Sequence, residues 1–552
     1  KKKSVLLANA PIAAALRPCR EESVDFDNTE NLYIEGDNLD VLKLLRETYL
    51  NRVKMIYIDP PYNTGKDFIY EDDFAEETGE FLRRDGQYDE QGNRLTPNLD
   101  SNGRFHTDWL NMIYPRLRIA RDLLTDDGVI FVSCDDNEQE NFKKILNEIF
   151  GERNSLGLFI INSTPNARDY GHIGKMHEFV LFYAKNFIAT ETNLLPELDK
   201  TFKYNDERGG FNVHPLYNSN EAFTKLNRPN LYYPFYIYLD KPIDKDFFAI
   251  GLEKKEGAIE IYPPKSVKNG VQFVWRWGKE KALKNLNVEI IGYKTGDGEY
   301  RIVQKMRHSE KIIRSILSDT SYSSRRGTAE VEEILEGKIF DFPKPISLLK
   351  DLVKVGAKED SIILDFFSGS ATTAHAVMQL NAEDGGKRKF IMVQLPEPCD
   401  ENSDAYKTGY KTIAEIGKER IRRAGKKIKE DNKDKPGIEN LDIGFRVLKL
   451  DSSNMKDVYY TPEEYAQMNF NLEGFMDNIK PDRTEEDLLF QVMLDLGIPL
   501  SAKIRQEGET FYVNDNYLIA CFGRVDTALI TEIAKKKPYY AVFRDSSFIN
   551  DS

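Results

Sequence analysis

The sequence predicts an α/β protein whose core is a wound, mostly parallel β-sheet. Two separated stretches of the chain alternate short runs of β-branched or aromatic residues with helical patterns. Two of the predicted strands run directly into turns built from Asp, Pro, Ser and Gly. Between the two stretches, from about residue 155 to 335, the alternation weakens. We therefore expect one sheet interrupted by an inserted domain.

The elements of the two stretches follow from periodicity. Leu39, Leu42 and Leu45 recur at helical spacing, directly after a short apolar run. The first stretch predicts strands at 31–35, 55–58 and 129–134 and helices at 37–50, 114–124 and 137–150. The second predicts strands at 361–364 and 390–393 and helices at 371–380 and 413–429. Thr484 is expected to cap a later apolar helix.

These patterns divide the chain into four segments. Residues 1–154 and 336–450 are the expected halves of one sheet, and residues 155–335 the inserted domain. Residues 451–552 are expected to form a further, smaller C-terminal domain. The inserted region interleaves aromatic residues with Arg, Lys and Asn, as in Asn227-Arg-Pro-Asn-Leu-Tyr-Tyr-Pro234 and Trp275-Arg-Trp-Gly-Lys-Glu-Lys281.

Composition excludes several classes of protein. The 552 residues include 77 Lys and Arg against 91 Asp and Glu, so the formal charge of −14 excludes a globally basic, histone-like binder. The hydrophobic content of 40% excludes a disordered chain, and no apolar run is long enough to cross a membrane. Asn9, Pro11 and Arg17 interrupt the signal-peptide-like start. Four scattered cysteines and six histidines without ligand spacing predict a cytoplasmic protein without a metal site.

The strongest motif is Asp59-Pro60-Pro61-Tyr62, which follows the apolar strand Met55-Ile-Tyr-Ile58. Two successive prolines make a stiff corner at the carboxyl end of the strand, where open α/β sheets bind ligands. The Asp59 carboxylate and the Pro60 carbonyl can both accept from one N–H₂ group. An ordinary surface turn is the alternative, since Asp-Pro often opens turns.

This corner suits methylation of an exocyclic base amine. The lone pair of such an amine is delocalised into the ring, so two acceptors that support its developing positive charge would help it to attack a methyl group. Tyr62 offers a flat face for a base flipped out of the duplex.

A second motif is Asp365-Phe-Phe-Ser-Gly369-Ser-Ala-Thr-Thr373, again placed between a strand and a helix. Gly369 allows close backbone approach to a ligand, and Asp365 can accept from an ammonium or hydroxyl group. This chemistry suits S-adenosylmethionine. Neither the dinucleotide-binding nor the P-loop pattern is present. A core strand followed by a Ser/Gly turn would look much the same.

The pair of motifs resembles the modification (Mod) subunits of type III restriction-modification systems, which are DNA adenine-N6 methyltransferases of the β arrangement. In that arrangement the catalytic motif precedes the target-recognition region and the cofactor motif follows it, as here. Further matching stretches are Glu35-Gly-Asp-Asn38, Phe340-Asp-Phe-Pro-Lys344-Pro345, Asp442-Ile-Gly-Phe445 and Ser452-Ser-Asn454. The resemblance implies a class I (Rossmann-like) methyltransferase fold with a mixed seven-stranded sheet.

The resemblance also implies roles for single residues. Asp59, Pro60 and Tyr62, in a corner completed by Pro61, would hold and stack the flipped adenine. The methionine end of the cofactor would lie on Asp365, Phe367, Ser368, Gly369 and Ser370, under Lys344-Pro345, with Asp37 near its adenine. The sequence departs from the family at Ala371, where many relatives carry glycine. It departs again at Gln394, where an acidic residue usually binds the ribose; Glu397 is the alternative.

The inserted region would be the target-recognition domain. The residue types that pair with base edges or phosphates there are Asn227, Arg228, Asn230, Arg276, Arg325 and Arg326. For aromatic residues such as Tyr232 and Trp275 we expect a place in that domain's core instead. The basic run from Lys418 to Lys427 either follows DNA phosphates or is a solvated helix face.

By the same resemblance, we expect S-adenosylmethionine as cofactor, double-stranded DNA as substrate, a homodimer and an ATP-dependent restriction (Res) partner. Neither a membrane nor a metal is expected to take part. Two alternative functions remain open at this point. An N4-cytosine methyltransferase faces the same chemical problem, and a DNA-specificity subunit without activity could keep the cofactor pocket only as structure.

Overall fold

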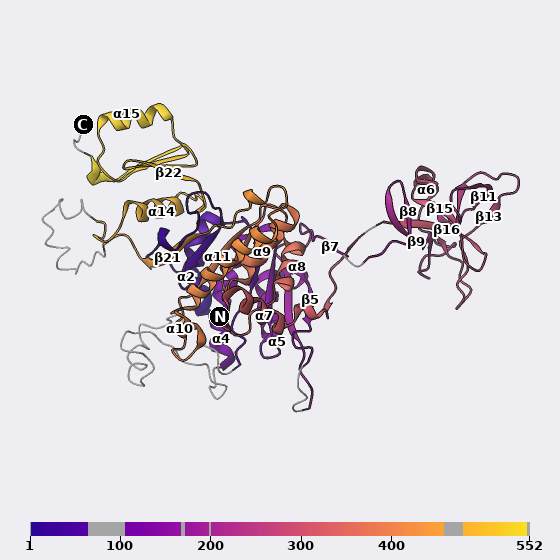
Figure 1. Cartoon of the computed structure of the whole chain (residues 1–552), viewed down its shortest axis with the longest axis horizontal. Coiled ribbons are helices and arrows are strands. Elements are labelled where there is room, and N and C mark those ends of the chain that lie inside the picture. The colour runs from indigo at the N-terminus through magenta and orange to yellow at the C-terminus, as the bar shows by residue number, and fades with distance from the viewer. Residues whose placement is uncertain are drawn as a thin grey trace. The chain divides into compact units, whose positions relative to one another are not determined.

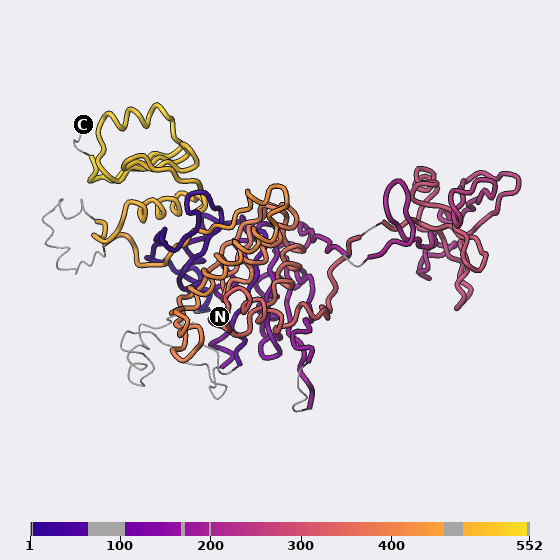
Figure 2. Tube along the Cα trace, viewed as in Figure 1, coloured from indigo at the N-terminus to yellow at the C-terminus, as the bar shows by residue number. Residues whose placement is uncertain are grey.

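The computed structural model describes residues 2–64, 105–166, 172–197, 200–307, 309–456 and 478–548. The chain divides into two compact units (Figure 1). Unit 1 comprises Lys1–Leu194 and Ile313–Ser552, and unit 2 comprises Leu195–Ile312. The chain trace passes from one unit to the other after Leu194 and returns at Ile313 (Figure 2). The inserted unit is therefore shorter at both ends than the predicted 155–335.

A ten-stranded sheet forms the centre of unit 1. In sheet order its strands are β1 (Ala14–Pro18), β21 (Arg446–Ser452), β2 (Leu32–Glu35), β20 (Lys389–Gln394), β19 (Ile362–Asp365), β3 (Val53–Ile58), β4 (Leu124–Cys134), β6 (Glu178–Ala184), β5 (Ser155–Ile161) and β18 (Ile316–Leu317). The seven strands from β2 to β5 make a mixed sheet in which β6 alone runs antiparallel to its neighbours. The predicted seven-stranded mixed sheet is thus present, and β1, β21 and β18 extend it at both edges.

The inner strands are apolar because the sheet is covered on both faces. All six residues of β3 are buried, as a central parallel strand requires. Helix α4 contacts both α1 and α2, and helices α7, α8, α9 and α11, which are labelled in Figure 1, form a second group. Their bounds are α1 (Lys2–Asn9), α2 (Asn38–Tyr49), α4 (Phe105–Leu123), α5 (Gln139–Leu146), α7 (Ser324–Leu335), α8 (Ile346–Gly356), α9 (Thr372–Asp384), α10 (Asp404–Thr408) and α11 (Ile413–Asp431).

Three helix boundaries differ from the sequence prediction by four residues or more, and one of them is the end of α9, at Asp384 rather than 380. Helix α4 begins at Phe105 rather than 114, and it contains Pro115 within its length. Helix α5 ends at Leu146 and continues as a π-helical turn over Asn147–Gly151. Short 3₁₀ turns occupy Arg20–Glu22, Glu152–Asn154, Pro229–Leu231, Thr320–Tyr322, Ile438–Asn440 and Asp545–Ser547.

The C-terminal segment is part of unit 1 instead of a separate compact domain. Helix α14 (Glu485–Asp495) begins with the predicted cap, because Thr484 and Asp487 form a capping box. Its Leu489 and Met493 join the same hydrophobic core as Leu42 of α2. A four-stranded sheet follows, with α15 (Thr527–Lys536) connecting its parallel strands β24 and β25. The strands are β22 (Ile504–Glu507), β23 (Thr510–Val513), β24 (Leu518–Cys521) and β25 (Tyr540–Phe543).

Unit 2 has its own core and its own sheet. Trp275, Phe235 and Ile237 lie at the centre of a buried cluster, so the predicted core role of Trp275 is confirmed. In order, the seven strands of the sheet are β13 (Ile259–Ile261), β11 (Phe235–Pro242), β12 (Phe247–Gly251), β15 (Ile290–Lys294), β16 (Tyr300–Met306), β9 (Gly209–Pro215) and β8 (Tyr204–Asp206). The remaining elements are β7 (Leu195–Pro196), β10 (Tyr217–Asn218), β14 (Val274–Trp275), β17 (Glu310–Lys311) and α6 (Lys279–Asn285).

Candidate active site

The two motifs meet at one edge of the main sheet. Strands β3 and β19 are parallel neighbours, with Leu364 paired to Ile56. Asp59 follows the last residue of β3, and Asp365 is the last residue of β19. Burial raises the pKa of Asp365 to about 7, and the negative charge of Asp59 adds to this effect. The corner and the turn therefore lie at the same edge of the sheet.

Asp59 presents one paired and one unpaired oxygen. Its Oδ2 lies 2.9 Å from Lys344 Nζ. Its Oδ1 is buried without a hydrogen-bond partner among the described residues. A buried carboxylate oxygen left unpaired is costly, so this atom is a ready acceptor for a ligand donor.

Helix α4 contacts the proline corner through a side-chain hydrogen bond. Trp109, which is fully buried, donates from Nε1 to the Pro61 carbonyl at 2.8 Å. Within the part of the chain that the structure describes, no donor is bonded to the Pro60 carbonyl. Immediately after the corner, Asn63 adopts a left-handed conformation (φ 58°) and donates to Glu138. Glu138 also accepts from Asn141 and contacts His106 Nδ1 at 2.6 Å.

Tyr62 and Lys344 share a further carboxylate, Glu178. The Tyr62 hydroxyl donates to Glu178 Oε2 at 3.3 Å, and Lys344 Nζ lies 3.3 Å from the same atom. Lys344 Nζ also lies 5.0 Å from the centroid of the Tyr62 ring. Burial alone would lower the pKa of Lys344, but the charges of Asp59 and Glu178 raise it well above its usual range. The lysine is therefore a permanent cation between two carboxylates.

The Asp365 carboxylate stabilises the turn that follows it by hydrogen bonds to two later residues. One carboxylate oxygen accepts from the Phe367 amide at 3.1 Å, and the other from the Thr373 hydroxyl at 2.5 Å. Gly369 lies in the left-handed region (φ 50°) with the Phe340 ring packed against it. Ala371 also takes a left-handed conformation (φ 59°), so the departure from glycine is accommodated by a backbone that alanine rarely adopts.

Gln394 is engaged in the turn. Its Oε1 accepts from the Gly369 amide at 2.7 Å, and its Nε2 donates to the Leu395 carbonyl. The expected ribose contact would have to compete with these bonds. Glu397 is half-buried, and burial raises its pKa.

Asp37 and Asn38 connect α2 to the cofactor turn. Asp37 Oδ1 accepts from the Leu39 and Asp40 amides and so caps α2. Its Oδ2 lies 3.2 Å from Arg116, a fully buried arginine on α4. Asn38 donates to the Phe366 carbonyl at 2.6 Å. Asp37, expected near the cofactor's adenine, is thus also a helix cap at the same edge.

The basic run on α11 is part of the packing of unit 1. Arg420 is fully buried and donates to the Ser370 and Thr372 hydroxyls at 2.8 and 2.6 Å. Lys418 is buried and pairs with Glu35 at 2.6 Å. For these two residues both the phosphate-tracking and the solvated-face interpretations are wrong. Instead, Arg420 stabilises the turn at 365–371 through its hydrogen bonds to Ser370 and Thr372.

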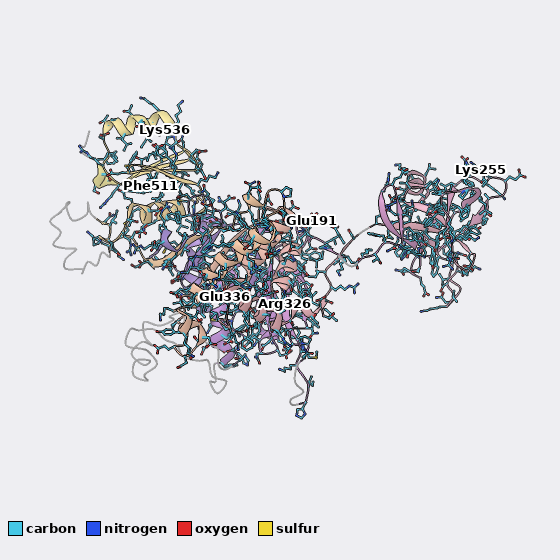
Figure 3. The ribbon with its side chains drawn as sticks, viewed as in Figure 1. Glu191, Lys255, Arg326, Glu336, Phe511 and Lys536 are labelled. Carbon is cyan, nitrogen blue, oxygen red and sulfur yellow. The ribbon has the colours of Figure 1, made fainter. Side chains whose placement is uncertain are left out.

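The residues proposed to read DNA separate into two groups. Asn227, Arg228, Asn230 and Arg276 are exposed in unit 2, whereas Arg325 and Arg326 are exposed on α7 of unit 1 (Figure 3 labels Arg326). Asn227 braces its own loop, since its amide accepts from Thr224 and donates to the Ala222 carbonyl. Tyr232 is half-buried and stacks on Tyr262.

Two other features are absent from the described residues. Among the described residues, no three His, Cys, Asp or Glu side chains gather as metal ligands would. No helix within the described ranges is long and apolar enough to span a membrane.

Comparison with known proteins decides the family. A family model described as DNA methylase matches residues 53–426. The EcoPI Mod subunit of Escherichia phage P1 is 35% identical over 504 residues, which cover 83% of this chain and 74% of the relative. The chain belongs to the Mod subunits of type III restriction-modification enzymes. It is a DNA methyltransferase that uses S-adenosylmethionine.

Other relatives agree with this Mod assignment. The EcoP15I Mod subunit of Escherichia coli is 34% identical over 499 residues, which cover 83% of this chain and 74% of the relative. Among solved structures, the PvuII DNA methyltransferase (cytosine-N4-specific) is 11% identical, with a TM-score of 0.31. The alignment covers 72% of this chain and 94% of that one, but a score so low adds nothing to the assignment.

The residues of the turn fit S-adenosylmethionine. Ser368 Oγ in this turn is buried without a hydrogen-bond partner in the described part of the chain. A donor or acceptor of the methionine part of the cofactor would satisfy it. Sequence reasoning missed Glu178, Trp109, Glu138 and Arg116, which support the site from distant positions. Of the missed residues that contact the site, Asn38 alone could have been found from the sequence, because it lies within the matching stretch Glu35–Asn38.

Proposed function

We propose that this Mod chain transfers the methyl group of S-adenosylmethionine to N6 of an adenine flipped out of duplex DNA. The observation that carries the proposal is the buried, unpaired Oδ1 of Asp59, at the sheet edge that also holds the Asp365 turn. An acceptor placed there meets the need of a base amine, which must give up ring conjugation to react.

The residues of the corner divide this task. Asp59 Oδ1 and the Pro60 carbonyl accept the two N–H bonds of the amine and favour a pyramidal nitrogen. The bound cofactor supplies an electrophilic methyl carbon. As the nitrogen attacks, the positive charge that develops on it is stabilised by the adjacent carboxylate. Tyr62 stacks against the extruded base, and Pro61, held by Trp109, keeps the corner rigid.

The cofactor contacts follow the turn. Asp365 faces the ammonium of the methionine part, with Phe367, Ser368, Gly369 and Ser370 lining that end and Lys344-Pro345 beside it. Asp37 lies toward the adenine. For the ribose we propose Glu397 in place of Gln394, because the Gln394 amide is already bonded to Gly369 and Leu395.

Unit 2 is proposed to read the DNA target. It carries 20 lysines and arginines against 16 aspartates and glutamates, a charge of +4, whereas the whole chain carries −14. A locally basic unit in an acidic chain suits contact with phosphates. Arg228, Asn230 and Arg276 are its proposed contacts, with Arg325 and Arg326 added from α7. A cytoplasmic homodimer that acts with a Res subunit completes the proposal, which rests on the relatives' type III names.

Mass spectrometry of nucleosides tests this proposal. Duplex DNA incubated with the chain and S-adenosylmethionine is digested, and methylated nucleosides are quantified. We expect N6-methyladenine. N4-methylcytosine would instead support the cytosine alternative, and DNA binding without any methylated product would support a specificity subunit without activity.

A further inference from the structure

Glu178 is the common partner of two residues of the catalytic corner. It is the first residue of β6. Its Oε2 accepts a hydrogen bond from the Tyr62 hydroxyl and lies 3.3 Å from Lys344 Nζ. Its side chain is 21% exposed, and that of Lys344 is 12% exposed. Interactions between these charges are therefore only weakly screened by solvent.

The first consequence concerns charge. Lys344 lies between Asp59 Oδ2 and Glu178 Oε2, so one ammonium is shared by two carboxylates. The group of three carries a net charge of −1. If Asp59 and Lys344 were alone, the pair would be neutral, and the carboxylate would support a developing positive charge less well.

The second consequence concerns geometry. The Tyr62 ring is constrained by the hydroxyl bond to Glu178 at its tip and by Lys344 Nζ over the ring. A stacking platform that is fixed before the base arrives loses less conformational entropy on binding. Tyr62 and Lys344 come from distant parts of the sequence, and the same glutamate holds both.

We propose that Glu178 is a positioning residue for methyl transfer, which orients Tyr62 and leaves the Asp59 corner with a net negative charge. This inference rests on the proposed function and names a residue that acts through Asp59, Lys344 and Tyr62 without touching the cofactor.

The test uses Glu178→Gln, which keeps an acceptor for Tyr62 but removes the charge. Turnover on methylatable DNA should fall by about 10- to 100-fold, while the Kd for S-adenosylmethionine stays unchanged. Glu178→Asp, which retains the charge, should recover most of the turnover. The matched control is Glu383→Gln, which removes a 2.9 Å pair with Lys350 elsewhere in unit 1 and should leave turnover unchanged.

A second measurement does not depend on catalysis. Acetic anhydride labelling of lysines, read by peptide mass spectrometry, should modify Lys344 several-fold faster in Glu178→Gln than in the wild type. The label on Lys338, whose side chain is 61% exposed, should not change. If the labelling of Lys344 does not change, and turnover in Glu178→Gln equals that of the wild type, the inference is overturned.

The two proposals fail in different ways. A wild-type chain that transfers no methyl group refutes the proposed function, and Lys344 labelling then still decides whether Glu178 holds the lysine. Turnover that falls equally in Glu178→Gln and Glu383→Gln would indicate a general structural role and would also overturn the inference. Tyr62→Phe isolates the hydroxyl bond, and its effect should add to that of Glu178→Gln, because the glutamine still accepts from Tyr62.

Discussion

The corner at Asp59–Tyr62 and the turn at Asp365–Ala371 are both contacted by side chains from distant parts of the chain, but their carboxylates differ, because Asp59 pairs with the distant Lys344 whereas Asp365 bonds to the residues that follow it. Lys344, Glu178 and Trp109 fix the corner. Asp365 instead bonds to Phe367 and Thr373, two and eight residues further along. The corner keeps an unpaired acceptor, while both oxygens of Asp365 are occupied.

This difference suggests a division of labour. A site for a transient base needs an acceptor that is free until the base arrives. A site for a cofactor needs a turn whose shape is set in advance, and Asp365 provides it while staying able to accept from an ammonium group. The following predictions test that division, beginning with the largest effect.

Asp59→Asn should abolish transfer while preserving cofactor binding. The amide is nearly isosteric, but it lacks the charge that supports the reacting amine, so kcat should fall by about 10³-fold. Radiolabel transfer to DNA measures turnover, and calorimetry measures the Kd for S-adenosylmethionine. A parallel loss of both would indicate that the corner and the turn do not have separate roles.

Cofactor affinity should depend on pH through Asp365, whose pKa is raised to about 7 chiefly by burial. An ammonium group prefers the ionised form, so the Kd should rise by up to about tenfold for each pH unit below 7. Calorimetry between pH 5.5 and 8 measures this, with Asp365→Asn as the control that removes the dependence. A flat Kd in the wild type would contradict the assignment of Asp365.

The same group affects stability without cofactor. Because the pKa of Asp365 is raised on folding, the folded chain retains a proton that the unfolded chain releases near pH 4. This contribution to the unfolding free energy is present below pH 4 and is lost as pH rises toward 7.

Gln394→Ala should give the smallest effect. Losing the acceptor for the Gly369 amide costs about 1 kcal/mol, which is about fivefold in the cofactor Kd. Gln379→Ala, on the exposed side of α9, is the matched control. Glu397→Gln should also raise the Kd if Glu397 binds the ribose, and an unchanged value would return that role to Gln394.

The parts of the fold and site that the sequence predicts are those that depend on local patterns. Apolar runs ending in Asp59 and Asp365 predict that both lie at the carboxyl edge of a parallel sheet, and the pairing of β3 with β19 confirms it. Thr484 was predicted as a cap because capping is a short-range bond.

Long-range partnerships could not be predicted in this way. From the sequence, Lys418 and Arg420 resemble surface cations. Periodicity does not show that Lys418 pairs with Glu35 or that Arg420 donates to the Ser370 hydroxyl, because these partners lie in other elements. Glu178 is an ordinary residue at the start of a strand until folding brings Tyr62 and Lys344 to it. The two ends of the inserted unit were misjudged because β5 and β6, which follow residue 154, and β18, which precedes residue 335, belong to the main sheet, and α7 belongs to unit 1.

A crystal structure of the chain with S-adenosylmethionine would test most directly whether the two turns form one reaction site. A reacting amine needs about 3 Å to the methyl carbon and about 3 Å to its acceptor. Because the N–H bond and the lone pair of a pyramidal nitrogen diverge, we expect the methyl carbon about 5 Å from Asp59 Oδ1, with the methionine end on residues 365–370. A cofactor bound elsewhere, or a methyl carbon more than about 10 Å from that oxygen, would contradict the account.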